Sequence, residues 1–443
     1  MAPKFFEELR HLANTMNGSP KTAHSPFEKD NHIYGLRGIL LISSFLWLFF
    51  QTFIPTVATH TTSGPGYQRL LRIIFGTVLW DESLISSFFF VLSARAICIR
   101  FLKDPTADNF AGTIFRRSIR LVVATGAALF ISYGIFAGLG TKYITSFKQT
   151  LQNNSINPPR VPKTALQGFN ALFDMFWVVR EYDGQAANAF WPSGTLGRIS
   201  LLYNQSWTTF FLMVLLPFAR PQWHPQVLLL FTFGAFWMCS WGWYNACALL
   251  VADATINSTL ALKLVSGLTI SEKKDWKVPY PLIGTFMIPI GLAMKYTWAV
   301  FPRYVNDELV LHPYLDLSEQ TTRRQFAAAD PYPRVDNFFI IFGLLLTVET
   351  LPRVRDILST PGLISLGKRS FSFFVAQSLV MWSAGIKLWT HIHVVNGTSV
   401  ALANLAVFFT TLVTIVLFAE AFYRAVDVPS QWLATVGYHW VTK

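Results

Sequence analysis

The chain has 443 residues, of which 52% are hydrophobic and 14% charged, with a mean hydropathy of +0.38. This composition excludes an ordinary soluble domain and is typical of a polytopic membrane protein. The net charge of +12 comes largely from basic residues in short turns beside apolar segments, which indicates membrane topology and anionic lipid headgroups rather than a nucleic-acid partner. Residues 1–33 are polar and of mixed charge, and we expect them to form a cytosolic tail rather than a cleaved signal peptide.

Ten apolar segments of about the length that a membrane helix requires come after this tail. They cover residues 35–58, 83–102, 116–139, 205–220, 226–241, 243–265, 280–301, 336–352, 364–388 and 398–424. We therefore predict an all-α fold, a polytopic bundle of about ten transmembrane helices formed by residues 34–443. The long segment 140–204 is aromatic and polar, and we expect it to lie on the lumenal side.

Basic residues mark the turns after the second, sixth and eighth of these segments. If the N-terminus is cytosolic, all three turns are cytosolic too, as the positive-inside rule requires. Glycosylation sequons give an independent test, because those at Asn153, Asn204 and Asn396 fall on the opposite, lumenal side. The sequence thus predicts an endoplasmic-reticulum-type membrane, two cytosolic termini and N-glycosylation at these three positions.

Arginines gather at the predicted cytosolic ends of the first three spans. Arg37 opens the first span in "YGLRGILLI", Arg95 lies inside the second, and "FRRSIRL" brings Arg116, Arg117 and Arg120 to the third. A charge at membrane depth normally faces the bundle interior, and guanidinium groups suit phosphate. We predict that these five arginines share a pocket for a phosphorylated cosubstrate. The alternative interpretation is a topology signal with lipid contacts.

Five motifs carry a resemblance to a known family. They are "YGLRGILLI", "FFFVLSAR", "FRRSIRL", "ISLGKRSFSFFVAQSLV" and "AEAFYRAVDVPSQWLA", in this order and spacing. Together they resemble the acyltransferase 3 family of ten-span membrane proteins, most closely its fungal-type members. The resemblance implies transfer of an acyl group from an acyl-CoA-like cosubstrate, with no tightly bound cofactor, and it implies that the arginines hold this donor.

The chain departs from the family pattern at three polar positions. Leu48 stands where the family carries a histidine eleven residues after the arginine, Gln377 stands in place of the histidine of "LVH", and Leu212 stands where many members have a glutamate. Acyl transfer to a hydroxyl generally requires a base. An ionisable group at membrane depth is functional by default, so Asp253 and Glu420 are our candidate catalytic groups, together with Arg95.

Each candidate has a simpler interpretation. Asp253 fits a neutral acid that is hydrogen-bonded to a neighbouring span, and Glu420 fits an ion pair with an arginine such as Arg95. His391 and His393 lie in a short lumenal turn, where a solvated turn is a simpler explanation than metal binding. The three cysteines all lie in apolar segments and indicate neither a disulfide framework nor a metal site.

Three functions therefore remain open. The first is a membrane-bound acyltransferase that acts on a small-molecule, sugar or lipid acceptor. The second keeps the fold but uses an acid to start the cyclisation or isomerisation of an isoprenoid, and the third is non-catalytic lipid binding or transport. The expected partners are a small-molecule or lipid substrate and membrane lipids, without nucleic acid; the oligomeric state stays open.

Overall fold

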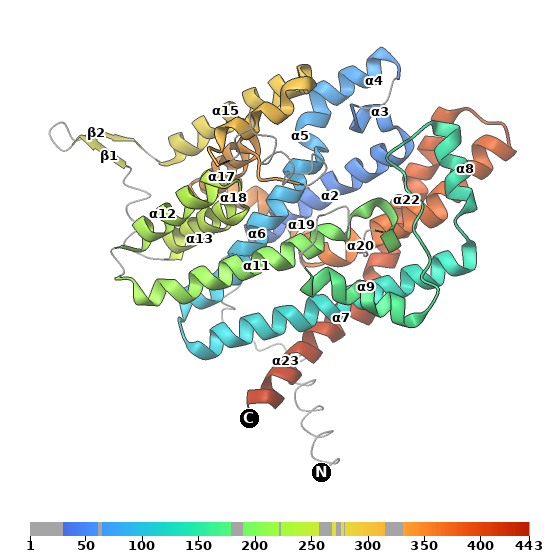
Figure 1. Ribbon diagram of the computed structural model, residues 1–443. Helices are drawn as coiled ribbons and strands as arrows, with labels where there is room; N and C mark the ends of the chain where they lie inside the picture. The colour runs from blue at the N-terminus through green and yellow to red at the C-terminus, as the bar shows by residue number, and fades with distance from the viewer. Residues whose placement is uncertain are drawn as a thin grey trace, which may run out of the picture.

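The computed structural model describes residues 30–60, 64–178, 189–220, 223–256, 268–271, 276–278, 280–314 and 331–442. Most of these residues lie in helices that pack side by side into a bundle (Figure 1). The predicted helical membrane bundle is therefore confirmed. Of the predicted cytosolic tail, only residues 30–33 are among the described residues, and they lead into the first helix.

The elements succeed one another with short connections. Up to residue 218 they are α2 (Asn31–Phe53), α3 (Pro55–Ala58), α4 (Gly66–Leu71), η2 (Arg72–Gly76), α5 (Thr77–Leu79), α6 (Glu82–Lys103), α7 (Ala107–Leu139), α8 (Lys142–Leu151), α9 (Ala165–Trp177), η4 (Pro192–Gly194), α11 (Gly197–Leu215) and η5 (Leu216–Phe218). They continue with α12 (His224–Trp237), α13 (Gly242–Ile256), β1 (Leu268–Ser271), β2 (Trp276–Val278), α15 (Tyr280–Val300), η7 (Pro302–Leu311), α17 (Val335–Thr350), α18 (Pro352–Leu358), α19 (Pro361–Lys368), α20 (Ser370–Val380), η8 (Met381–Gly385), α21 (Ile386–Thr390), η9 (His391–Val395), α22 (Val400–Phe422), η10 (Tyr423–Asp427) and α23 (Val428–Thr442). The short antiparallel pair β1–β2 lies at the edge of the bundle (Figure 1).

Each of the ten predicted apolar segments contains a helix. Among the described residues, seven helices are long and apolar enough to cross a membrane, or eight if α17 and α18, which meet at a bend of 102°, form one span. The difference from ten arises because α12 has 14 residues and the described part of α13 has 15, whereas a span needs about 20. The last third of the sixth predicted segment, residues 257–265, lies outside the described residues.

The long helices alternate in direction, which gives the bundle two ends. Both α6 and α17 begin beside Lys295 of α15, whose ammonium lies 3.1 Å from the Asp81 carboxylate and 3.7 Å from that of Asp336. Both helices then run to a point where Arg95 of α6 lies 2.6 Å from Glu349 of α17. We name these regions the Lys295 end and the Glu349 end.

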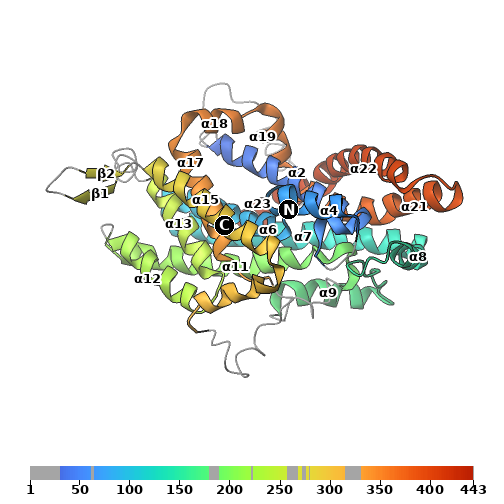
Figure 2. The same ribbon diagram turned by 90° about the horizontal axis from the view of Figure 1, so that it is seen from above.

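Glycines let α2 pack closely against α18 and α19, which lie beside it in Figure 2. A methyl group at Gly35 would overlap the carbonyl oxygen of Leu358, and one at Gly367 would overlap that of Tyr34. Small residues are the usual means by which membrane helices approach one another. The glycines of "YGLRG" thus fix α2 against α18–α19, while Arg37 reaches across to the Leu92 carbonyl of α6.

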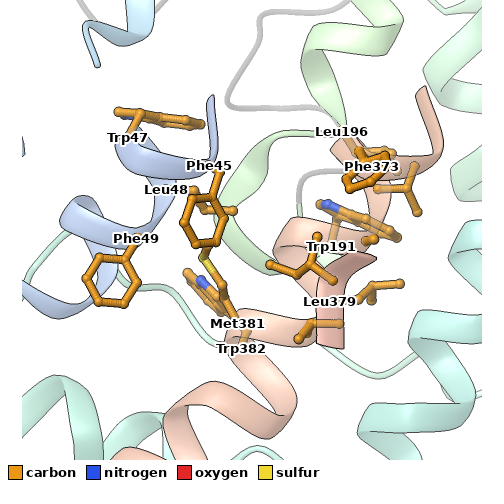
Figure 3. Packing of buried hydrophobic residues seen from close by; sticks show 14 of the residues in the cluster. Phe45, Trp47, Leu48, Phe49, Trp191, Leu196, Phe373, Leu379, Met381 and Trp382 are labelled. Atoms are coloured by element: carbon orange, nitrogen blue, oxygen red, sulfur yellow. The ribbon is translucent and has the colours of Figure 1, made fainter. Parts of the chain in front are cut away.

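An apolar core joins α2 to the region around η8. Phe45, Leu48 and Phe49 lie beside Met381 and Trp382 in this core (Figure 3). Leu48 is only 1% exposed. The position at which the resemblance places a histidine is therefore enclosed by apolar side chains in this chain.

Candidate functional site

A cavity of about 170 Å³ lies between α2, α6, α7, α11 and α20. Its wall combines four kinds of side chain, arginine, serine, phenylalanine and small aliphatic groups, and we call it the arginine cavity. The arginines are Arg37, Arg117, Arg120 and Arg198; the serines are Ser44, Ser86, Ser93 and Ser370; the phenylalanines are Phe89, Phe90, Phe371 and Phe374. The structure thus brings together three of the five arginines that the sequence predicted.

Local sequence explains how α7 supplies two of these arginines. Its first turn is capped by Thr106, whose hydroxyl accepts a hydrogen bond from the Asn109 amide at 3.3 Å. Ten residues into the helix, Arg117 and Arg120 are three positions apart, so they lie on the same face. That face meets α6 and α11, because Arg117 donates to Ser93 and Ser206 at 2.7 and 2.9 Å.

Two of the four arginines have a carboxylate partner. Arg120 lies 3.0 Å from Asp427 of η10, and Arg198 pairs with Glu82 at the start of α6. Since both carboxylates offset a guanidinium charge, these two arginines add little net charge to the cavity.

The other two arginines are held by neutral groups. Arg37 donates to the Leu92 carbonyl at 2.9 Å, and Arg117 donates to two serine hydroxyls. Within the part of the chain that the structure describes, neither forms an ion pair with a carboxylate. Two positive charges therefore lie inside an apolar bundle without a counter-charge, which favours an anionic ligand.

Arg95 lies outside this cavity, which corrects the prediction that it shares a pocket with Arg37. Its side chain is 3% exposed and lies 2.6 Å from Glu349, which His32 also approaches at 3.2 Å. The reason is helical geometry. Ser93 of α6 faces Arg117, and residues two positions apart on a helix do not face the same way, so Arg95 turns toward α17.

Arg116 also points away from the arginines with which it was grouped. Its guanidinium lies 5.0 Å from the centre of the Tyr438 ring on α23, and its Nε donates to the Gly112 carbonyl at 3.1 Å. It is not among the residues that line the arginine cavity. Adjacent positions on one helix thus separate Arg116 from Arg117.

The two predicted acids lie apart from the cavity as well. Asp253 is 8% exposed on α13, and no described residue forms a hydrogen bond or ion pair with its carboxylate. Glu420 lies on α22 and pairs with Arg369 and Arg424, each at 2.7 Å, rather than with Arg95. Neither acid lines the arginine cavity.

A second cavity, of about 520 Å³, shares Arg198 and Ser86 with the first. Tryptophans and charged groups line it, and we call it the tryptophan cavity. The tryptophans are Trp47, Trp80, Trp241 and Trp298. Lys295, which also lines it, places this cavity toward the Lys295 end. The sequence held a signal for it, because Lys295 is an ionisable residue inside a predicted span.

Comparisons with known proteins give no family for this chain. No protein-family model matches it, and neither does any curated protein or solved structure. A function must therefore be inferred from the chemistry of the two cavities.

A network of buried ion pairs forms one wall of the tryptophan cavity. Arg334, just before α17, lies 3.0 Å from Asp336 and 2.7 Å from Glu308 of η7. Lys295 approaches Asp336 at 3.7 Å and donates to the Asn337 side-chain oxygen at 2.6 Å. Two carboxylates thus share the guanidinium of Arg334, and this has consequences for their protonation.

Burial raises the pKa of Glu308 to about 7, and the Asp336 carboxylate adds to this increase against the opposing effect of Arg334. The folded protein therefore keeps this proton at pH values where the unfolded chain has lost it, and stability falls as pH rises from the ordinary glutamate pKa to the raised one. We expect Glu308→Gln to remove this part of the pH dependence. Thermal unfolding of purified protein at pH 5 and pH 8 measures it, and a wild-type difference that persists unchanged in Glu308→Gln contradicts the prediction.

The predicted glycosylation sites differ in their exposure. Asn153 is fully buried and its amide donates to the Gln51 and Thr52 carbonyls at 2.8 and 3.2 Å, so a glycan there does not fit this fold. Asn204 is half-buried inside α11, whereas Asn396 is exposed in the turn before α22. The structure corrects the prediction at Asn153 and leaves Asn396 as the accessible sequon.

The paired histidines lie close to Asn396, in η9. The Nδ1 atom of His393 lies 2.7 Å from the Thr398 carbonyl oxygen, and its ring packs on Trp389. Among the described residues, no group of three or more histidine, cysteine, aspartate or glutamate side chains could hold a metal ion. A structural role in the turn accounts for His393.

Proposed function

We propose that this chain is a membrane-bound, acyltransferase 3-like enzyme that uses an acyl-CoA-like donor. The donor binds in the arginine cavity, and a small molecule, sugar or lipid accepts the acyl group. The observation that carries this proposal is the position of Arg37 and Arg117, which line one cavity and have no carboxylate partner among the described residues.

The wall of the cavity suits a phosphorylated thioester. A guanidinium group binds phosphate through two parallel hydrogen bonds, and such charge-assisted bonds gain strength in an apolar interior. Phe371 and Phe374 offer apolar surface for an acyl chain on the opposite side. The volume of about 170 Å³ is below the roughly 300–1,000 Å³ of a typical ligand pocket, so we place only the thioester and its phosphate-bearing arm inside.

We further propose that the Glu349 end faces the cytosol of an endoplasmic-reticulum-type membrane. Arg100 and Lys103 end α6 there, and Arg355 is nearby in α18. This concentration of basic residues supports the orientation through the positive-inside rule. Both termini are then cytosolic and Asn396 is lumenal, where its exposure suits glycosylation.

The other two functions have less support from the geometry. An acid-initiated isoprenoid reaction in the arginine cavity requires a carboxyl group there, and none is among its described lining residues. Non-catalytic lipid binding does not require two guanidinium groups without counter-charges in the bundle interior.

The test is a binding measurement on two neighbouring arginines. Purified protein in detergent is incubated with radiolabelled acetyl-CoA, and Arg117→Ala is compared with Arg116→Ala. A hydrogen bond to a charged group contributes about 1.5–3 kcal/mol, so Arg117→Ala should weaken binding about 10- to 100-fold. Arg116→Ala removes the same charge from the next residue, outside the cavity, and should leave the affinity almost unchanged.

Two results contradict the proposal. One is wild-type protein that binds no acetyl-CoA, and the other is an equal loss of affinity in both variants. Thermal unfolding of each variant shows whether the fold is retained, because Arg117→Ala also removes hydrogen bonds to Ser93 and Ser206.

A further inference from the structure

Arg198 lies where the arginine cavity and the tryptophan cavity meet. It is in the first turn of α11 and lines both cavities, as does Ser86 of α6. Its guanidinium pairs with Glu82, donates to the Ser86 hydroxyl and lies 4.7 Å from the centre of the Trp47 ring. Contacts with α2 and α6 thus hold this one side chain at the boundary between the two spaces.

The tryptophan cavity differs from the arginine cavity in charge. Its cations and carboxylates pair with one another, as in Lys295 with Asp81 and Arg334 with Asp336. A wall of balanced charge does not select an ion. Four tryptophans instead offer flat apolar faces beside polar groups, a combination that suits a neutral ligand with a ring and hydroxyl groups.

We propose that the tryptophan cavity binds the acyl acceptor, a neutral hydroxylated ring compound, and that Arg198 is a catalytic residue which stabilises the transition state of acyl transfer. This inference rests on the proposed function, because it takes the donor thioester to be in the arginine cavity. The hydroxyl of the acceptor then meets the thioester carbonyl beside Arg198.

The reaction at this boundary is an exchange of an ester for a thioester. The acceptor oxygen forms a bond to the carbonyl carbon, the carbon–sulfur bond breaks, and the hydroxyl proton is transferred to the sulfur, which gives an ester and a free thiol. Negative charge develops on the carbonyl oxygen during this step. A guanidinium that is already fixed by Glu82 and Ser86 stabilises that charge without reorganisation.

Arg198 and Arg117 should therefore affect different steps. The charge of Arg198 is offset by Glu82, so it contributes little to the binding of an anionic donor, whereas Arg117 has only neutral partners. Replacement of Arg198 should lower the rate of transfer and spare donor affinity. Replacement of Arg117 should do the reverse.

The experiment measures acetyl-CoA binding and thiol release separately. Wild-type protein, Arg198→Lys, Arg198→Gln and the double variant Arg198→Gln/Glu82→Gln are each incubated with acetyl-CoA and cyclohexanol, menthol or methyl glucoside. The double variant leaves no unpaired carboxylate, so it controls for misfolding. The three alcohols distinguish simple ring, terpenoid and sugar acceptors.

We expect wild-type protein to release thiol with at least one alcohol. Loss of one transition-state donor lowers a rate by about 100- to 1,000-fold, so both glutamine variants should lose thiol release to this extent while acetyl-CoA affinity stays within about threefold. Arg198→Lys keeps the charge and should lose less.

Each other outcome overturns the inference. Wild-type protein that binds acetyl-CoA but acylates none of the alcohols, unchanged rates in the glutamine variants, or a loss of donor affinity equal to the loss of rate each contradicts a role for Arg198 in transfer. A wild-type protein that binds no acetyl-CoA overturns the proposed function itself, so the two failures are distinguishable.

Discussion

Replacement of Glu349 by glutamine is expected to destabilise the folded protein by about 3–5 kcal/mol, because it leaves the Arg95 charge buried without its partner. Arg95 is 3% exposed, and its closest carboxylate oxygen is that of Glu349 at 2.6 Å. The Nε and Nη1 atoms of Arg95 have no hydrogen-bond partner among the described residues. The side chain thus depends on Glu349 for most of its compensation, since Asp30 is 3.9 Å away.

Two variants make this measurement specific. Arg355 also approaches Glu349, at 3.4 Å, but it is 43% exposed, so Arg355→Ala should cost at most about 1 kcal/mol. The double variant Arg95→Met/Glu349→Leu removes both charges and should recover much of the loss. Chemical unfolding in detergent measures all three. If Glu349→Gln is as stable as Arg355→Ala, the burial of this ion pair has no energetic consequence.

The sequence predicted the helices better than it predicted their faces. Length and hydropathy located all ten apolar segments, since a membrane helix must be long and apolar whatever it packs against. The grouping of Arg37, Arg117 and Arg120 also holds in the structure. Arg95 was misplaced because depth in the membrane says that a charge faces inward but does not say toward which neighbour. That direction depends on Glu349, which lies 254 positions later in the chain.

The tryptophan cavity was beyond sequence reasoning for a different reason. Its wall combines Asp81, Lys295 and Arg334, which are far apart in the chain and become neighbours only when α6, α15 and α17 pack together. Arg198 lies in a segment that was expected to be a lumenal extension, whereas it opens α11. Leu48 shows the converse, because the family pattern expects a histidine at a position that the fold encloses in its core.

Replacement of Arg334 by methionine should have the second large effect on stability, again about 3–5 kcal/mol at neutral pH. Arg334 is the closest cation to Asp336 and Glu308, which are 0% and 2% exposed. Methionine retains an apolar stem but leaves two buried carboxylates beside each other. Lys295 offsets only part of this charge, since it lies 3.7 Å from Asp336 and also serves Asp81.

The loss in Arg334→Met should depend on pH in a defined direction. Without the guanidinium, burial and mutual repulsion raise the pKa of the Glu308 carboxyl further, so protonation relieves the penalty at low pH and ionisation imposes it at high pH. The variant should therefore unfold at nearly the wild-type temperature at pH 5 and well below it at pH 8. Arg303→Met, at an exposed arginine of η7, is the matched control and should show no such difference. A deficit in Arg334→Met that is equal at both pH values would mean that lost packing, rather than the two carboxylates, destabilises the variant.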